Sequence, residues 1–394
     1  MPCAYCKGNH NSESCSWYAR ARIFFKHRDI SANFSGGSPA PFVGHFGYPF
    51  VNVGFLAPPG VVDSSNYDNP RGWSSDGVSI SDIAELRGSL VNSHVRSSVK
   101  NFDNRVVEFA QISAMSSKPV FSSVELEKKP LFRVFFDENH SPMGPSGVVK
   151  KVVQEDNPKI PFIVEKSVGD FDLKAVDALS ILYDRGIDEN KISQLLSVGN
   201  LGVGKNRKIV PTKWSITATD DIIGKSIHKN VMLFSEISSY EFFTSSYHSN
   251  YYYIHLYPGS WEFELFEYSL SNGGLAVDRE GFLGRSSYAD NCVGGYYAVR
   301  LAVLEYLSSV KRQAGVFVIR IITDEYTIPL GVWVTREASR KALSSKPVIF
   351  DAKEIMKSFV INSIHSKHFC YVERFFKQSS IHNKKENQKK IWEY

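Results

Sequence analysis

The sequence predicts an α+β protein with a small N-terminal zinc module, one large mixed α/β core and a flexible C-terminal tail. Three observations predict this organisation. Three cysteines and a histidine crowd the first fifteen residues, helical and strand patterns are interspersed through the middle, and the last stretch is polar and charged. We expect the module at residues 1–20, the core at residues 21–378 and the tail at residues 379–394.

The composition is ordinary for a globular protein: the 394 residues are 43% hydrophobic, 13% aromatic and 22% charged. No run approaches the roughly 18 apolar residues that a membrane span needs, and no secretory signal opens the chain. We therefore expect a cytoplasmic protein with no membrane partner. Five Lys and two Glu between Lys377 and Tyr394 supply +3 of the net charge of +5. A nucleic-acid surface on the core must then be a local patch of cations.

The first element is a predicted structural Zn²⁺ site. Its ligands are Cys3, Cys6, His10 and Cys15, spaced Cys-x2-Cys-x3-His-x4-Cys. Three thiolates and one imidazole are a common closed, tetrahedral set for structural zinc. The spacing resembles a CCHC zinc knuckle, one residue shorter between the second Cys and the His. Two roles remain open: Tyr5 and Trp17 stack bases of single-stranded nucleic acid, or the zinc only pins the N-terminus onto the core.

The core begins with a stretch of weak signals. Residues 31–80 are rich in Gly, Pro, Ser and Asn, which indicates mostly irregular structure. Asp82–Glu85 has the residues of a capping box, so a helix is expected to start there. Short apolar runs then predict strands at Val106–Phe109, Pro119–Val124 and Leu131–Phe136.

Stronger signals follow in the second half of the core. Two helices are expected at Phe171–Asp184 and Asp188–Ser197, and the longest helix at Val293–Arg312. Runs enriched in aromatic and β-branched residues predict strands at Val231–Ile237, Tyr251–Tyr257, Trp261–Tyr268, Val316–Ile322 and Gly331–Val334. The order of these elements mixes helices and strands, which favours an α+β core.

A dense polar block at residues 206–221 supplies the candidate site residues of the core. Arg207, Lys208 and Lys213 are candidates to hold phosphates, and Trp214 is a candidate to stack a base. Asp220 and Asp221 are candidates for binding a divalent ion or for acid–base chemistry. The alternative is a solvated loop in which Trp214 joins the core and Thr219 or Asp220 caps a short helix.

The tail ends in a predicted docking peptide for a DNA sliding clamp (PCNA). Its side chains are Gln388, Ile391, Trp392 and Tyr394. In a single 3₁₀ turn, residues three apart lie on one side, so Ile391 and Tyr394 would enter one apolar pocket. The chain stops at the aromatic position where the clamp-binding pattern usually has two adjacent aromatics, so Trp392 is expected to help.

Three blocks of sequence carry a resemblance to a known family. They are Phe46–Gly54, Val210–Asp221 and Pro329–Glu337. Together with the zinc module in front and the clamp peptide at the end, they resemble the archaeal Nre family, whose members are linked to DNA repair. The resemblance implies an association with repair and with the archaeal clamp. His45, Asn52 and Arg336, in or beside the other blocks, are candidates to converge with residues 206–221 on a shared polar pocket.

Three functions remain open on this basis. The first is a clamp-tethered repair factor whose core binds nucleic acid or a nucleotide, with or without hydrolytic chemistry on the nucleotide. The second is a non-enzymatic adaptor in repair, and the third is a metabolic enzyme with an incidental tail. A concave pocket that gathers Lys213, Asp220, Asp221 and Arg336 would favour an enzyme or nucleotide binder, and a flat basic face would favour an adaptor.

Overall fold

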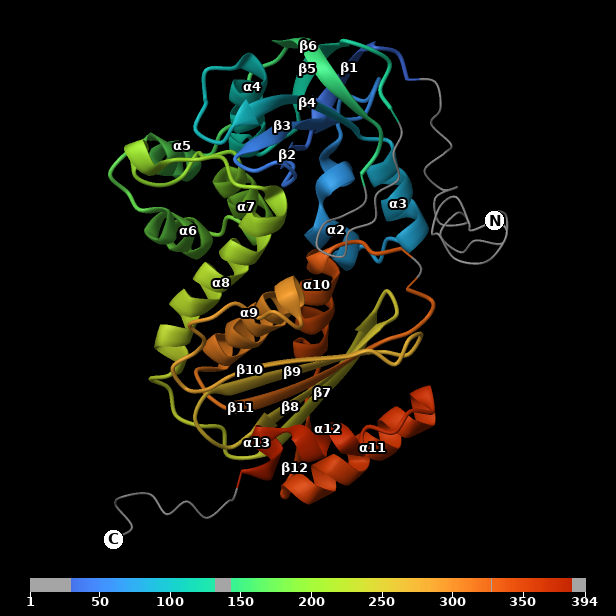
Figure 1. Ribbon diagram of the computed structural model, residues 1–394. Coiled ribbons are helices and arrows are strands. Elements are labelled where there is room, and N and C mark those ends of the chain that lie inside the picture. Colours follow the sequence, from blue (N-terminus) through green and yellow to red (C-terminus); the bar gives the residue numbers. More distant parts are fainter. Residues whose placement is uncertain (1–29, 132–142, 327, 385–394) are drawn as a thin grey trace, which may run out of the picture. The chain divides into compact units, whose positions relative to one another are not determined.

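The computed structural model describes residues 30–131, 143–326 and 328–384 (Figure 1). The sequence predicted one core, but the chain divides into two compact units. The first comprises Met1–Ile223 and Thr327–Val334, and the second comprises Gly224–Tyr326 and Thr335–Tyr394. Two predictions lie outside the described residues: the zinc ligands Cys3, Cys6, His10 and Cys15, and the clamp peptide with Gln388, Ile391, Trp392 and Tyr394.

The first unit is built on a six-stranded sheet with the spatial order β1-β5-β6-β4-β3-β2. Its strands are β1 (Asn33–Ser38), β2 (Ala40–Val43), β3 (Phe50–Ala57), β4 (Val91–Ser98), β5 (Val120–Leu126) and β6 (Ser146–Gln154). Neighbouring strands are antiparallel except β4 and β6, which run parallel. The predicted strand at 119–124 is confirmed as β5.

The expectation of mostly irregular structure at residues 31–80 is wrong, because β1, β2 and β3 lie within it. Glycines in this region serve close backbone contacts inside the sheet. A Cβ atom at Gly36 in β1 would lie 2.3 Å from the carbonyl oxygen of Pro58, which is far closer than atoms can approach. Residues 31–80 thus have the composition of a loop, but they form strands that need glycine where two backbone segments lie too close for a side chain.

Helices of the first unit cover the sheet and extend beyond it. They are α2 (Pro70–Ser75), α3 (Ile80–Gly88), α4 (Arg105–Met115), α5 (Phe162–Gly169), α6 (Ala175–Asp184) and α7 (Glu189–Ser197), with 3₁₀ turns η3 (Ser65–Asp68) and η4 (Gly204–Asn206). Helix α4 packs on one face of the sheet, against β3, β2 and β6. Its residues Val106 and Phe109 join a core cluster with Phe55, Val120 and Val124.

Two predictions in this unit change, and a third is not tested. The predicted strand Val106–Phe109 is wrong, since it is the first turn of α4, where the side chain of Asn104 accepts a hydrogen bond from the Val106 N–H at 2.8 Å. Helix α3 starts at Ile80, two residues before the predicted capping box, because Ser79 is the N-cap. The predicted strand at 131–136 lies almost wholly outside the described residues.

Two helices contain residues of both units: α8 (Thr212–Val231) and α10 (Val332–Leu343). Each replaces a predicted strand. Val231 is the last residue of α8, so the strand expected at 231–237 is wrong, and the strand expected at 331–334 is the start of α10. Short apolar runs fit a helix end and a strand equally well, and periodicity over four to seven residues does not separate them.

The second unit has a six-stranded sheet with the order β10-β9-β11-β8-β7-β12. Its strands are β7 (Tyr240–Tyr247), β8 (Asn250–Tyr257), β9 (Glu262–Ser269), β10 (Leu275–Glu280), β11 (Gly315–Ile322) and β12 (Val348–Phe350). Only β9 and β11 pair in parallel among these strands. The strands predicted at 251–257, 261–268 and 316–322 are confirmed.

Helices cover both faces of this second sheet (Figure 1). On one face lies α9 (Val293–Val310), whose Tyr306 ring meets Phe243 at 5.0 Å. The helix expected at 293–312 is confirmed, but it is not the longest, since α9 has 18 residues and α8 has 20. On the other lie α11 (Lys353–His368), α12 (Glu373–Gln378) and α13 (Ser380–Asn383). Their apolar side chains, including Phe376, pack against Phe317 of β11 in one cluster.

The packed core continues beyond the boundary expected at Ser379. Glu264 of β9 is almost fully buried and accepts hydrogen bonds from the Ser379 hydroxyl at 2.6 Å and the Ser380 N–H at 2.9 Å. Ile381 is also buried. The buried carboxylate thus fixes α13 on the sheet, and the described chain stays ordered through Lys384. Within the described ranges, no helix is long and apolar enough to cross a membrane.

Candidate nucleic-acid interface

The turn between β2 and β3 presents three large aromatic side chains to solvent. Phe46 is 69% exposed, Tyr48 42% and Phe50 55%. Gly47 between them has φ +80°, a left-handed conformation that glycine adopts without strain. Neighbouring aromatics exposed on one turn are uncommon, because each forfeits the burial that normally stabilises a fold. The turn therefore indicates a binding surface.

A fourth aromatic joins this turn from the middle block. Trp214, in the first turn of α8, is 45% exposed, and its ring lies 5.2 Å from that of Tyr48. The Thr212 hydroxyl accepts a hydrogen bond from the Val43 N–H at 2.9 Å, which ties the start of α8 to β2. We call Phe46, Tyr48, Phe50 and Trp214 the aromatic patch. Two of the three sequence blocks thus meet here.

Exposed lysines lie on the backbone segments that adjoin the aromatic turn. Backbone hydrogen bonds align three segments: the Val99 N–H donates to Pro49 at 3.0 Å, and the Ile209 N–H donates to Val99 at 2.8 Å. These bonds bring the exposed residues Lys100 and Lys208, next in sequence to Val99 and Ile209, alongside the turn. Basic side chains beside stacked aromatics are the combination that binds single-stranded nucleic acid.

Arg96 extends the basic rim onto the sheet. It pairs with Asn52 in the register of β4 and β3, and both are exposed, so they share the open face with Phe50. Its guanidinium also lies against the turn, because a Cβ at Gly47 would be 2.4 Å from Arg96 Nη2. On the same face, burial lowers the pKa of His94 below its usual 6.5, which keeps this imidazole neutral at pH 7.

The structure brings several predicted site residues together here. The His45 ring lies 4.0 Å from the Phe46 ring, and Asn52 stands beside Phe50 on the open face. Lys213 precedes Trp214 in the first turn of α8. The middle block is therefore a helix start with a half-exposed tryptophan, and the alternative with Trp214 in the core is wrong.

Arg207 instead connects its own loop to the end of α5. Its guanidinium donates to the carbonyls of Gly202, Val168 and Asp170 at 2.7, 2.8 and 3.0 Å. It also lies 4.4 Å from the centre of the Phe171 ring. Three donors directed at backbone carbonyls leave this side chain little capacity for a phosphate.

Two of the remaining candidates are buried side chains. Asp220 is buried in α8, and Arg336 is buried in α10 and belongs to the second unit. No three metal-binding side chains gather anywhere in the described ranges, so Asp220 and Asp221 are not part of such a group there. The middle and late blocks do share a small cavity of about 80 Å³ in the first unit, through Thr212, Ile216, Val332 and Trp333.

Comparison with known proteins covers nearly the whole chain. The family model "Archaeal Nre, N-terminal" matches residues 11–273, and "Archaeal Nre, C-terminal" matches residues 280–394. DNA repair protein NreB of Archaeoglobus fulgidus is 36% identical over 375 residues, which is 93% of this chain and 92% of that protein. DNA repair protein NreA of Haloferax volcanii is 35% identical over 329 residues, 79% and 78% of the two chains. NreA of A. fulgidus is 36% identical over 362 residues, 89% and 90% of the two chains. No solved structure matches.

Proposed function

The chain belongs to the archaeal Nre family, and from this premise we propose that it is a DNA repair factor. In this proposal its core binds single-stranded DNA at the aromatic patch, and its C-terminal peptide recruits it to the sliding clamp. The repair role follows the names of its relatives. The observation that carries the DNA-binding part is the exposure of Tyr48, Phe50 and Trp214 beside Arg96, Lys100 and Lys208.

Physical reasons favour a single strand over a duplex. Every base has a flat face that stacks on an aromatic ring, and each such contact contributes roughly 1–3 kcal/mol. In a duplex these faces are hidden within the base stack, so the rings would find no partner. The cations meet the backbone phosphates, which makes binding weaker at high salt. The patch therefore suits exposed strands of no particular sequence, which arise at gaps and damaged sites.

Fluorescence anisotropy with a labelled oligo(dT) tests the DNA-binding part. The double variant Phe50→Ala/Trp214→Ala is expected to weaken binding at least about 30-fold, since two stacking contacts are lost. Phe162→Ala is the control, because Phe162 is an aromatic of the first unit that is even more exposed than Phe50 and Trp214 and lies on another element, α5. Equal affinities for the wild type and the double variant would refute the proposal, as would an equal loss in the control.

The clamp-binding part rests on the sequence of the tail. Calorimetry with the sliding clamp should show binding by the wild type and none after deletion of residues 388–394. Ile391→Ala/Tyr394→Ala should do nearly the same, because these side chains supply the apolar contact. Asn387→Ala is the control just outside the pattern. Ile381 is unsuitable as a control, because it is buried in the second unit and its loss would destabilise the fold.

We also propose the structural zinc site. Metal analysis of the purified protein should find about one zinc per chain, and Cys6→Ser should release it. Undiminished zinc in that variant would refute the assignment. The described core should stay folded without the metal, since it buries extensive apolar clusters of its own.

A further inference from the structure

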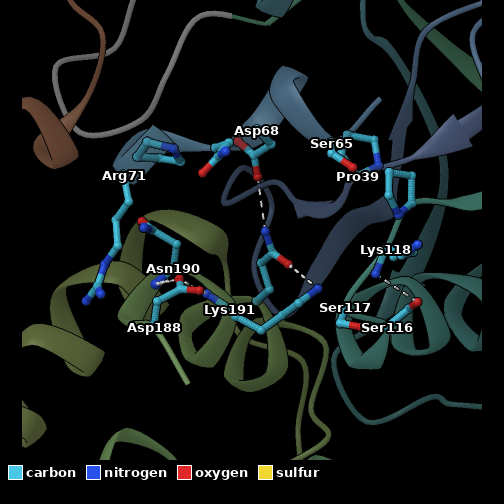
Figure 2. A pocket seen from close by; sticks show the side chains of 14 residues that line it. Pro39, Ser65, Asp68, Arg71, Ser116, Ser117, Lys118, Asp188, Asn190 and Lys191 are labelled. Carbon is cyan, nitrogen blue, oxygen red and sulfur yellow. Dashed lines mark hydrogen bonds between the residues drawn. The ribbon is translucent and has the colours of Figure 1, made fainter. Parts of the chain in front are cut away.

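A polar cavity of about 230 Å³ lies in the first unit, separate from the aromatic patch (Figure 2). Segments far apart in sequence form its walls: the end of η3 with the start of α2, the loop after α4, and the first turn of α7. Its volume equals that of roughly eight liquid waters, which is ample for a small charged group with part of its carrier.

Lys191 projects from α7 into this cavity (Figure 2). Its ammonium donates to the Ser113 carbonyl at 3.3 Å and to Gln194 Oε1 at 3.2 Å. An ammonium has three hydrogens, so one donor is left for a ligand. No carboxylate lies within ion-pair distance of Lys191 in the described part of the chain. Burial lowers the pKa of Lys191 to about 8, which leaves it mostly charged at pH 7.

The carboxylates that line the cavity are occupied by other partners. Asp68 pairs with Arg87 at 2.5 Å through one oxygen and accepts from Gln194 Nε2 at 3.0 Å through the other. Asp188 is the N-cap of α7, and one of its oxygens accepts the N–H groups of Asn190 and Lys191 at 2.9 and 3.0 Å. These negative charges are thus offset by a guanidinium and by a helix N-terminus.

Lys118 supplies a second positive charge. It lies in the loop after α4, on a different wall from Lys191, and its side chain makes no ion pair with any described residue (Figure 2). Hydroxyl groups of Ser65 and Ser117 and the amides of Asn69 and Asn190 also line the space. The hydroxyls of Ser65 and Ser117 already donate to Asp63 and to the Lys159 carbonyl, so the lysines and the amide N–H groups are the donors that remain. Two lysines on separate walls with amide donors between them fit an anion with several oxygens and more than one charge.

We propose that this cavity binds a phosphomonoester group, with Lys191 and Lys118 as its charged contacts. A monoester carries close to two charges at pH 7 and presents three free oxygens, which matches the donors present. The group comes from one of two sources: a free nucleotide, or the 5′-phosphate at the end of a DNA strand. The strand-end source rests on the proposed DNA-binding function, and the free-nucleotide source does not.

Calorimetry of the full-length protein with inorganic phosphate and with a nucleoside 5′-monophosphate tests the site. Lys191→Met is expected to weaken the binding of both ligands at least about tenfold, because it removes one hydrogen bond from a charged donor. Lys118→Met is the second test, because this lysine is exposed and its replacement leaves the fold intact. Lys166→Met is the control, an exposed lysine of the same unit on α5. Phosphate binding that is absent in the wild type, or unchanged in both test variants, would overturn the proposal.

Anisotropy with 5′-phosphorylated and 5′-hydroxyl oligonucleotides separates the two sources. Tighter binding of the phosphorylated strand that Lys191→Met abolishes assigns the site to strand ends. Binding of the monophosphate without that preference assigns it to a free nucleotide. The proposed binding of DNA at the aromatic patch and the proposed binding of phosphate in the cavity can be refuted independently. Phe50→Ala/Trp214→Ala should keep phosphate binding while losing strand binding, and Lys191→Met should keep binding of the 5′-hydroxyl strand.

Discussion

The two sheets differ in how far their aromatic side chains are buried. In the second unit, helices cover both faces, and strand β8 buries almost every side chain in the run Tyr252–Tyr257. In the first unit, α4 covers one face, while the other keeps Phe50, Asn52 and Arg96 exposed at its β3 end. Both sheets have six strands, so the difference lies in what covers them. Aromatics are core in the one and available for ligands in the other.

The contrast teaches that composition alone does not mark a binding site. Phe317 and Phe50 are both strand phenylalanines, yet Phe317 is fully buried among Phe266, Phe376 and His255. What distinguishes Phe50 is its exposure next to cations. Variants of buried and of exposed residues test whether exposure next to cations separates a binding residue from a core residue.

Phe317→Ala should destabilise the protein by about 3–5 kcal/mol, because it removes a fully buried ring and leaves a cavity. Phe50→Ala should cost less than about 0.5 kcal/mol, since Phe50 is mostly exposed. Chemical denaturation monitored by circular dichroism measures both. Similar losses in the two variants would mean that Phe50 is a structural residue, and the contrast between the sheets would fail.

Acid should weaken the second unit through His255. Burial lowers its pKa from 6.5 to about 3, and its Nδ1–H donates to the Phe317 carbonyl at 2.8 Å. The unfolded chain binds a proton below pH 6.5 and the folded chain does not, so stability falls as pH drops from 6.5 towards 3. The slope is about 1.4 kcal/mol per pH unit, or about 2 kcal/mol between pH 6.5 and 5.

His255→Gln should lessen the acid slope by about 1.4 kcal/mol per pH unit while keeping a donor for the carbonyl. The slope that remains belongs to other histidines such as His248 and His368, whose pKa values burial lowers to about 4. Urea denaturation at a series of pH values compares the variant with the wild type. Above pH 7 the two stability curves should run parallel, which serves as the internal control. A difference between the variants that stays constant from pH 7 to 5 would show that the folded protein accommodates a charged His255.

Gly47→Ala should have a modest effect on stability and a selective effect on DNA binding. Its φ of +80° costs alanine about 1–2 kcal/mol, and the new Cβ would displace the Arg96 guanidinium. Gly77→Ala is the matched control, with φ +65° and nothing within 4 Å of the added atom. Both should lose similar stability, but only Gly47→Ala should weaken oligo(dT) binding. Equal oligo(dT) binding by both variants would show that the turn is not part of the DNA-binding site.

Sequence reasoning identified β8, β9 and β11 of the second unit, because their buried side chains leave long aromatic and β-branched runs such as Tyr251–Tyr257. It missed the other three strands of that sheet, β7, β10 and β12. It missed β1 to β3, where Gly36 and its neighbours are needed for close backbone contact and resemble a loop. It also misassigned the ends of α8 and α10, whose apolar residues fit either element. Local pattern is decisive only where an element is long or uniformly buried.

The candidate sites divide in the same way. Trp214, His45 and Asn52 were candidates because they lie in or beside blocks that resemble the family. The structure places Trp214 in the aromatic patch and His45 and Asn52 beside it. Lys191 and Lys118 were missed, since no motif links them and only the fold brings their segments to one cavity. The sequence offered one weak indication of this cavity. Asp188 is a typical N-cap residue, which places Lys191 in the first turn of the helix that follows.

Ultraviolet cross-linking of the full-length protein to oligo(dT), followed by mass spectrometry of the peptides, locates the surface that holds the strand. Stacked aromatic rings lie against the bases, so cross-links should form at Tyr48, Phe50 and Trp214, with the buried aromatics of β8 and β11 unmodified. This result would place single-stranded DNA on the open face of the first sheet. Cross-links confined to other parts of the chain, with peptides containing residues 46–50 and 214 unmodified, would contradict the account.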